Sequence, residues 1–213
     1  MDLPAHRGTG RRRRLEAIVT IRPATVADHE QIARICLLTG AAGNDASGKF
    51  SNDTTLAAVY ATPYLHAPDC FAFVWDVDGE ARGYVLGTTD TRAFQQWFVD
   101  EWWPQCAPQH PVRTSDDAWL LPSASDPHRM LIPQLSEYPA HLHIDLLVDQ
   151  QGRGAGRQLI EVAAAHARDH GARGIHLVAE KANAGAQAFY PRVGFSAIAE
   201  SDTAVTFARP LRP

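Results

Sequence analysis

The sequence lacks the features that mark membrane-spanning and secreted proteins. No apolar run approaches the about 18 residues that a membrane-spanning helix needs. The N-terminus also has no apolar core of a secretory signal. Only three cysteines occur, Cys36, Cys70 and Cys106, and they are widely separated and odd in number. This pattern favours free thiols in a cytoplasmic protein over a disulfide framework or a metal site.

The sequence also lacks a large net charge of either sign. The formal net charge of the 213 residues is −4, so no general attraction to nucleic acid or acidic membranes is expected. The one strong charge run, Arg11 to Arg14, is expected to belong to a disordered basic tail over residues 1–16. With 45% apolar and 21% charged residues and no evident repeat, residues 17–213 are expected to form a single domain.

A loop that holds Gly152, Gly154 and Gly156 follows an apolar strand expected at 141–148 and precedes a helix expected at 154–170. No Lys follows these glycines and no Ser or Thr is placed to hold Mg²⁺, so the loop is not a P-loop. Their spacing also differs from the G-x-G-x-x-G of dinucleotide-binding folds. The unpaired N–H groups and the dipole of a helix N-terminus nevertheless favour an anion, and the expected guest is a phosphate or pyrophosphate.

The remaining pattern predicts an alternation of strands and helices. Strands are expected at 18–22, 70–77, 81–88, 174–180, 195–200 and 204–208, and helices at 25–39, 53–61 and 183–192. Asp78-Gly79 is a strong hairpin signal. The crossover from the strand at 141–148 to the strand at 174–180 predicts that these two run parallel.

Residues 91–140 follow this pattern poorly and are expected to form an irregular insertion that contains seven prolines. A helix is expected at 93–103, with Phe94, Trp97, Phe98 and Trp102 along one side. These aromatic side chains are expected to belong to the core, and a role in lining a substrate mouth stays open.

Two motifs together carry a resemblance to a known family. Gln151, Gly154 and Gly156 fit Q/R-x-x-G-x-G/A, and a second pattern follows, N-x-x-A-x-x-F-Y-x-x-x-G-F from Asn183 to Phe195. In this order and spacing they resemble the GCN5-related N-acetyltransferases, the GNAT family, over nearly the whole chain. The resemblance implies an α/β (α+β) fold with a central mixed, mostly antiparallel twisted sheet, a splayed parallel strand pair and flanking helices.

A narrower resemblance rests on T-I-R-P-A, D-V-D-G-E-A-R-G-Y-V-L-G-T-T-D, the tryptophan-containing segment and Y-P-A-H-L-H-I-D. These stretches resemble the acetyltransferase-like domain of O-GlcNAcase and its free-standing bacterial relatives. The eukaryotic domain has lost much of the acetyl-CoA loop, whereas this sequence keeps it, so cofactor binding is expected here. Two departures from the family pattern are Val148, where many members have Pro, and Pro191, which is expected to end the last helix early.

The family resemblance implies acetyl-CoA as cosubstrate and a set of residues that bind it. Backbone groups of the splayed strand would bind the pantetheine arm, and N–H groups of the loop would hold the pyrophosphate. Asn183 would bind pantetheine, cap its helix, or do both. The expected cofactor-binding residues are Leu146, Leu147, Val148, Gln151, Gly152, Arg153, Gly154, Ala155, Gly156, Arg157, Asn183, Ala186, Phe189 and Tyr190.

The chemistry requires a proton donor for the leaving thiolate and a base for the amine. The family motif makes Tyr190 the candidate general acid. Asp145, a carboxylate inside an apolar strand, is the first candidate for the base, with His143 on the same face as the second. Glu137 and Asp117 are weaker candidates, and a purely structural role for Asp145 or His143 stays open.

The expected function is acetyl transfer from acetyl-CoA to a primary amine, without a metal. The alternatives are a non-catalytic acetyl-CoA-binding or interaction module and a nucleotide-binding protein. The sequence does not identify the acceptor, which could be a small molecule or a peptide, and homodimerisation is left open.

Overall fold

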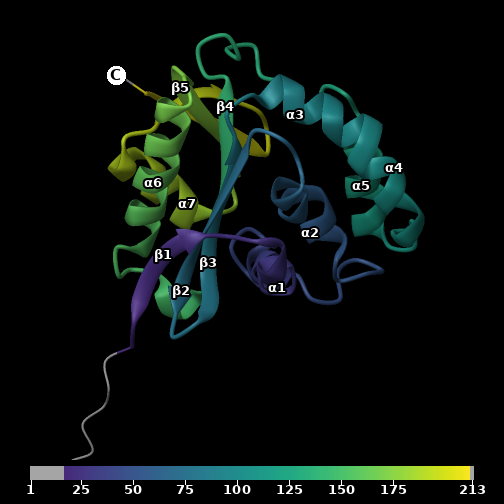
Figure 1. Ribbon diagram of the computed structural model, residues 1–213. Helices are drawn as coiled ribbons and strands as arrows, with labels where there is room; N and C mark the ends of the chain where they lie inside the picture. The colour runs from purple at the N-terminus through teal and green to yellow at the C-terminus, as the bar shows by residue number, and fades with distance from the viewer. Residues whose placement is uncertain (1–16, 212–213) are drawn as a thin grey trace, which may run out of the picture.

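The computed structural model describes residues 17–211, and the expected basic tail at 1–16 lies outside them. Seven strands form one sheet in the order β1-β2-β3-β4-β5-β7-β6, mostly antiparallel, with helices on both faces (Figure 1). The strands are β1 Val19–Pro23, β2 Cys70–Val77, β3 Glu80–Thr88, β4 Ala140–Leu146, β5 Gly174–Glu180, β6 Ser196–Glu200 and β7 Ala204–Pro210. The predicted fold class is confirmed, including the parallel pairing of β4 with β5.

The helices cover the sheet unequally. On one face lies α6, Ala155–Asp169, and on the other lie α1, His29–Thr39, and α2, Thr55–Tyr60 (Figure 1). The short α7 spans Ala184–Phe189 and continues as one 3₁₀ turn, Tyr190–Val193, with Pro191 within it. No described helix combines the length and hydropathy that crossing a membrane requires.

Alternation along the central strands separates two hydrophobic cores. On β3, the buried Tyr84 and Leu86 pack with α1 and α2, whereas Val85 between them packs with the residues around α6. The hairpin before this strand turns at Asp78 and Gly79, whose φ angles of 55° and 90° are both positive. Positive φ at both central residues fits the right-handed twist of the strands, as the Asp-Gly signal predicts.

The sheet is nearly divided between β4 and β5. Only two register pairs join these strands, Ala140 with Ile175 and His141 with His176, at their N-terminal ends. Beyond His141 the two strands diverge, while β4 continues to pair with β3 as far as Leu146. The divergence opens the sheet toward the carboxyl end of β4, where the glycine loop begins.

Residues 91–139 are more helical than the sequence indicates. They contain α3 Thr91–Trp97, a π-helical turn Phe98–Trp102, α4 Trp103–Cys106, a 3₁₀ turn Ala107–Gln109 and α5 Ser115–Ala124. Aromatic contacts hold them together, and the rings of Phe98 and Trp103 stack with centroids 6.1 Å apart. Much of the expected irregular insertion is therefore helical. Pro122 lies inside α5, where proline normally signals a break, whereas Pro104 lies in the first turn of α4, where proline is tolerated.

Candidate active site

The glycine loop has an unusual backbone at two positions. Gly152 and Gly154 have φ angles of 72° and 85°, in the left-handed region that only glycine adopts at little cost. A Cβ atom at either position would meet no described atom within 4 Å, so the backbone conformation requires glycine here. Gly154 is the N-cap of α6, and the first helical residue is the buried Ala155. The exposed loop therefore opens onto the helix N-terminus.

Gly156 is required for a different reason. A Cβ atom there would lie 3.0 Å from Cζ of Phe189 and 3.4 Å from Cδ1 of Leu146. The absence of a side chain lets the first turn of α6 pack directly against α7. The two sequence motifs thus contact each other in the fold.

The other loop residues divide into bonded and free groups. The Gln151 side chain donates to the Leu146 carbonyl oxygen at 2.9 Å, which ties the loop to the end of β4. The Arg157 guanidinium donates to the Arg192 carbonyl oxygen at 2.8 Å. Arg153 is exposed and makes no side-chain hydrogen bond within residues 17–211.

Backbone groups along β4 face two ways. The Leu147 N–H donates to the Arg82 carbonyl oxygen at 3.0 Å, so this amide is already used by β3. Because successive amides of a strand point to opposite edges, the N–H groups of Leu146 and Ile144 point toward the gap. Val148 follows as the start of a 3₁₀ turn and is 83% exposed. Ile144 was missed by the sequence analysis, although the same alternation would have indicated it.

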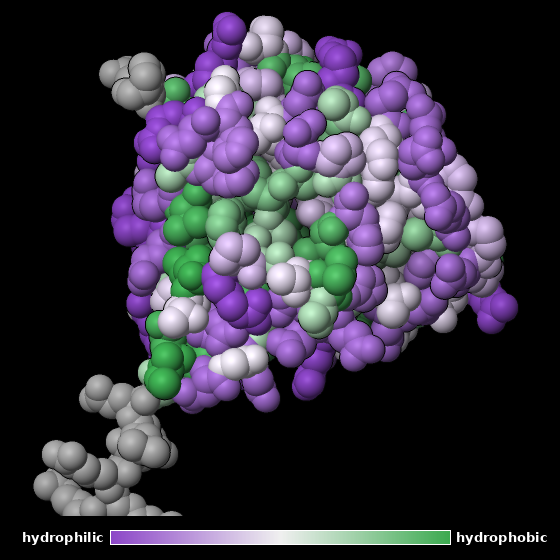
Figure 2. Space-filling model, in the orientation of Figure 1, coloured by the Kyte–Doolittle hydropathy of each residue, from purple (hydrophilic) through white to green (hydrophobic). Residues whose placement is uncertain are grey.

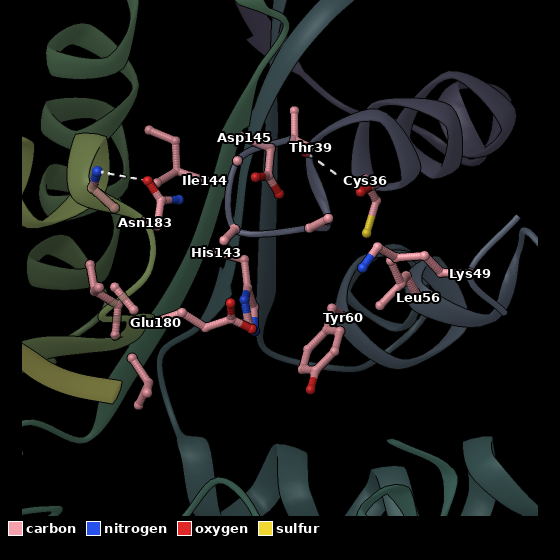
Figure 3. Close-up of a pocket in the computed structure, with 18 of the residues that line it drawn as sticks. Cys36, Thr39, Lys49, Leu56, Tyr60, His143, Ile144, Asp145, Glu180 and Asn183 are labelled. Carbon is pink, nitrogen blue, oxygen red and sulfur yellow. Dashed lines mark hydrogen bonds between the residues drawn. The ribbon is translucent and has the colours of Figure 1, made fainter. Parts of the chain in front are cut away.

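A cavity of about 420 Å³ lies in the gap beside these amides. Figure 2 shows hydrophobic residues around a hollow in the middle of this face, between the sides that carry α7 and α2. In Figure 3, Asp145 and His143 project from β4 between Asn183 on one side and Cys36 and Lys49 on the other. Ala186 and Tyr190 line the same cavity. The structure therefore brings the three candidate catalytic side chains to one space.

Asn183 caps α7 from the cavity wall. Its Oδ1 atom accepts a hydrogen bond from the Ala186 N–H at 2.9 Å. The capping role considered from the sequence is confirmed. The side-chain amide nitrogen has no such bond within the described residues, and the residue lines the cavity.

Asp145 is a poorly solvated carboxylate. Burial raises its pKa to about 6, and hydrogen bonding to Tyr84 acts against that rise. The Tyr84 hydroxyl donates to Oδ2 of Asp145 at 2.5 Å from the neighbouring strand β3. A carboxylate with a pKa near neutrality can accept a proton at physiological pH and release it again.

His143 lies two residues earlier on the same face and is held as the neutral imidazole. Burial, together with the positive charge of Arg129, lowers its pKa to about 4. Its ring packs against those of Tyr60 and Tyr64, with centroids 5.8 and 5.5 Å away. No side chain within residues 17–211 makes a hydrogen bond to this ring.

Tyr190 is packed among the rings of Phe189, Phe195 and Phe207. Burial raises the pKa of its phenol, and the charge of Asp145 raises it further. The phenol therefore stays protonated at neutral pH, which is the form that a proton donor requires.

The two weaker candidates for the base lie outside the cavity. Asp117 is buried and accepts hydrogen bonds from the N–H groups of Ser51, Arg113 and Thr114. Although burial acts to raise the pKa of Asp117, these donors lower it overall, and the carboxylate serves to begin α5. Glu137 is exposed and lines neither this cavity nor the one beside it.

A glycine-rich helix N-terminus that follows the diverging strand of a mixed sheet, with a pocket in the divergence, is the arrangement that the comparisons identify. The family model described as acetyltransferase (GNAT) family matches residues 42–195. The crystal structure of SsHAT is 38% identical in sequence, covers 92% of this chain and 99% of its own, and superposes with a TM-score of 0.83. The chain belongs to the GNAT acetyltransferase family.

More distant structures share the fold. A GCN5-related N-acetyltransferase from Kribbella flavida is 17% identical over 91% of this chain and 98% of its own, with a TM-score of 0.55. The protein yncA from Salmonella typhimurium, described as a structure with its cofactor acetyl-CoA, is 17% identical over 91% and 94%, also with a TM-score of 0.55. The family uses acetyl-CoA, which supports an acyltransferase with that cosubstrate. Within residues 17–211 no group of three or more His, Cys, Asp or Glu could hold a metal ion.

Proposed function

We propose that this protein is an acetyl-CoA-dependent N-acetyltransferase that moves the acetyl group directly to a primary amine. One observation carries the proposal: Asp145, His143 and Tyr190 all line one cavity beside the divergence of β4 from β5. The glycine loop and the N-terminus of α6 follow β4 directly along the chain. The loop suits a pyrophosphate, and the cavity suits a thioester and an amine.

The coenzyme would be held mainly by backbone. Free N–H groups between Gly152 and Arg157 would bind the pyrophosphate, where the dipole of α6 favours negative charge. The gap-facing amides of Ile144 and Leu146 would bind the pantetheine arm as an added strand would. The free amide nitrogen of Asn183 would donate to the same arm. Exposed Arg153 would add a charge-assisted contact to a phosphate.

The reaction would then need two proton transfers. Asp145 would take a proton from the amine, directly or through water, and the nitrogen would attack the carbonyl carbon of the thioester. As the C–N bond forms, the C–S bond breaks and the departing thiolate takes the proton of the Tyr190 phenol. The attacking nitrogen loses its second proton to water, and Asp145 releases the proton that it took. The phenolate regains one proton from solvent, so the overall reaction of an ammonium substrate releases one proton. If Asp145 has only a structural role, His143 would be the base.

The test begins with binding and continues with turnover. Calorimetry should show uptake of acetyl-CoA, and an amine-library assay should show acetylation of at least one member. In Tyr190→Phe, the single-turnover rate of acetyl transfer should fall by about 10²-fold or more because a general acid is lost, while the affinity for acetyl-CoA is unchanged. No uptake of acetyl-CoA would overturn the proposed function, and a Tyr190→Phe variant that turns over normally would overturn the assignment of the acid.

A second candidate function follows from the narrower resemblance seen in the sequence. We propose that the chain is a free-standing relative of the acetyltransferase-like domain of O-GlcNAcase, supported by stretches such as D-V-D-G-E-A-R-G-Y-V-L-G-T-T-D in β2 and β3. If such a relative has lost turnover, it would act as an acetyl-CoA-binding or interaction module. Uptake of acetyl-CoA without acetylation of any amine in the library would favour this candidate.

The three thiols bear on where the protein works. Cys36, Cys70 and Cys106 are all free. Free thiols persist in a reducing compartment, which supports our proposal of a cytoplasmic location.

A further inference from the structure

A second and larger cavity, of about 750 Å³, adjoins the first. Tyr60, Trp119, His143 and Glu180 line both, so the two spaces meet at the candidate catalytic face of β4. A volume of this size is typical of a pocket for a small molecule. If acetyl-CoA occupies the gap beside Asn183, the second cavity is the space left for the acceptor.

The helical insertion supplies one wall of this second cavity, through Trp119 on α5 and through Arg129 and Met130 in the segment that follows it. The Arg129 guanidinium carbon lies 4.9 Å from the ring centroid of Phe98 and 5.5 Å from that of Tyr60. These contacts fix the plane of the guanidinium against aromatic faces.

Burial lowers the pKa of the Arg129 guanidinium, Tyr60 and Asp126 act to raise it, and no described residue forms an ion pair with it. Its Nε and Nη2 atoms are shielded from water and make no hydrogen bond within residues 17–211. None of the ion pairs formed by these residues includes Arg129. Unpaired buried donors on a charged group are costly, so a guanidinium held in this way is suited to an anionic ligand. Nε and Nη2 form one edge of the guanidinium, which can bind a carboxylate with two parallel hydrogen bonds once the side chain turns that edge toward the cavity.

We propose that the second cavity is the acceptor pocket and that the acceptor is an amino carboxylate, with its carboxylate on Arg129 and its amine at the face of Asp145 and His143. The proposal rests on the N-acetyltransferase function proposed above. Arg129 and the His143 ring both lie within 6 Å of the Tyr60 ring centroid, so one small molecule can reach both.

The other charged groups of the cavity fit a zwitterion. Glu180 and Asp202 face it from β5 and from the turn between β6 and β7, and they would attract the ammonium group before it loses its proton. Lys181 also lines the cavity but is paired with Glu200 at 3.0 Å. A polycation would place positive charge against Arg129, which disfavours polyamines and basic peptides.

The apolar walls indicate the rest of the acceptor. Trp119 is 66% exposed although it is a large aromatic residue, and it lies at the meeting point of the two cavities. Met130 and Leu177 add further apolar surface to the larger one. Such walls suit an amino acid with an apolar or aromatic side chain.

The experiment compares pairs of acceptors that differ only in the carboxylate. A panel of L-amino acids is assayed against the amines that lack the α-carboxylate, such as phenylalanine against 2-phenylethylamine, with spermidine and a lysine-rich peptide as cationic probes. For the preferred amino acid, kcat/KM should exceed that of its decarboxylated partner by about 10- to 100-fold, the value of a charge-assisted hydrogen bond. Equal or better use of the decarboxylated or cationic probes would overturn the proposal.

Variants of Arg129 test whether this residue causes the preference for a carboxylate. Arg129→Met should lose the same 10- to 100-fold for the amino acid, through KM, and little for the decarboxylated amine. Arg129→Lys, which keeps the charge but not the two-donor edge, should fall between the two. Arg113→Met is the matched control, because Arg113 is an exposed arginine that precedes α5 and lines neither cavity. An equal loss for both acceptors in Arg129→Met and Arg129→Lys would mean a structural role only and would overturn the proposal.

Calorimetry separates failure of this inference from failure of the proposed function. Protein saturated with CoA should bind the preferred amino acid more tightly than its decarboxylated partner, and Arg129→Met should abolish the difference. Uptake of acetyl-CoA with transfer only to acceptors without a carboxylate contradicts the inference alone. The absence of both uptake and transfer contradicts the proposed function itself.

Discussion

At the scale of single residues, the role proposed for Asp145 as a base is opposed to the stability of the fold. The Asp145 carboxylate lies on the central strand, accepts one hydrogen bond from Tyr84 and is otherwise poorly solvated. The cost of this environment appears as a pKa raised to about 6 by burial. The same shift provides a base that can act near neutral pH, whereas the pKa of about 4 of His143 makes the imidazole a weaker one.

The Asp145→Asn variant tests the effect of this carboxylate on activity and on stability. In the wild type, the single-turnover rate of acetyl transfer should rise with pH through about 6 as the carboxylate becomes ionised, and the variant should lose that limb together with most of its activity. A limb near 4 that survives in the variant would point to His143 instead.

The stability of the same variant should change in the opposite direction. Because the folded state binds the proton more tightly than the unfolded state, wild-type stability falls as pH rises between about 4 and 6. Asp145→Asn should therefore unfold with a free energy about 2 kcal/mol higher at pH 7.5, and the gain should vanish at pH 4. The control Asp117→Asn should be destabilised at pH 7.5, since the pKa of Asp117 is lowered in the fold. Denaturant unfolding at both pH values measures the effect, and equal stability of wild type and Asp145→Asn at pH 7.5 would contradict it.

At the scale of elements, the contact between α6 and α7 connects the two sequence motifs. Gly156 in the first turn of α6 leaves room for the ring of Phe189, which in turn packs beside Tyr190. The position of the candidate acid therefore depends on the absence of a side chain one helix away. The glycine motif at the start of α6 therefore also helps to position Tyr190.

Gly156→Ala should disturb this contact. The new Cβ atom would lie 3.0 Å from Cζ of Phe189, so the expected loss of stability is about 1–3 kcal/mol, together with a fall in kcat as Tyr190 moves. Adding Phe189→Leu should recover part of the lost stability and part of the lost kcat, because the two positions are in contact. The control is Gly185→Ala in α7, where a Cβ atom meets only Asn183 Oδ1 at 3.5 Å. Thermal unfolding of wild type, the two single variants and the double variant measures the loss of stability. A Gly156→Ala variant as stable as wild type would refute the tight contact.

At the scale of the whole molecule, the sequence predicts the sheet well and the acceptor side poorly. Local signals determine the hairpin at Asp78-Gly79 and the strand β5, whose predicted bounds match the observed ones. The helices of the insertion were underestimated because their prolines argue against them, and tertiary contacts such as the stacking of Phe98 on Trp103 stabilise them. Arg129 was not identified, since its significance lies in the absence of a partner, which no sequence pattern encodes.

Hydrogen exchange can test how the coenzyme joins the two parts of the sheet. Acetyl-CoA at 100 times its Kd should slow exchange of the gap-facing Ile144 and Leu146 amides by up to about 100-fold. Adenosine 3′,5′-bisphosphate, which lacks the pantetheine arm, is the control and should leave these amides unprotected. Equal protection by both ligands would mean that the arm does not lie along β4.

The two register pairs that join β4 to β5 have a consequence for turnover. A pantetheine arm bound between the diverging strands would supply the backbone hydrogen bonds that β4 and β5 do not make to each other beyond His141. Spent CoA would make the same backbone bonds as the acetylated form, since the acetyl group takes no part in them. We therefore expect departure of CoA, rather than acyl transfer, to limit the steady-state rate, so that a burst of product precedes slower cycling.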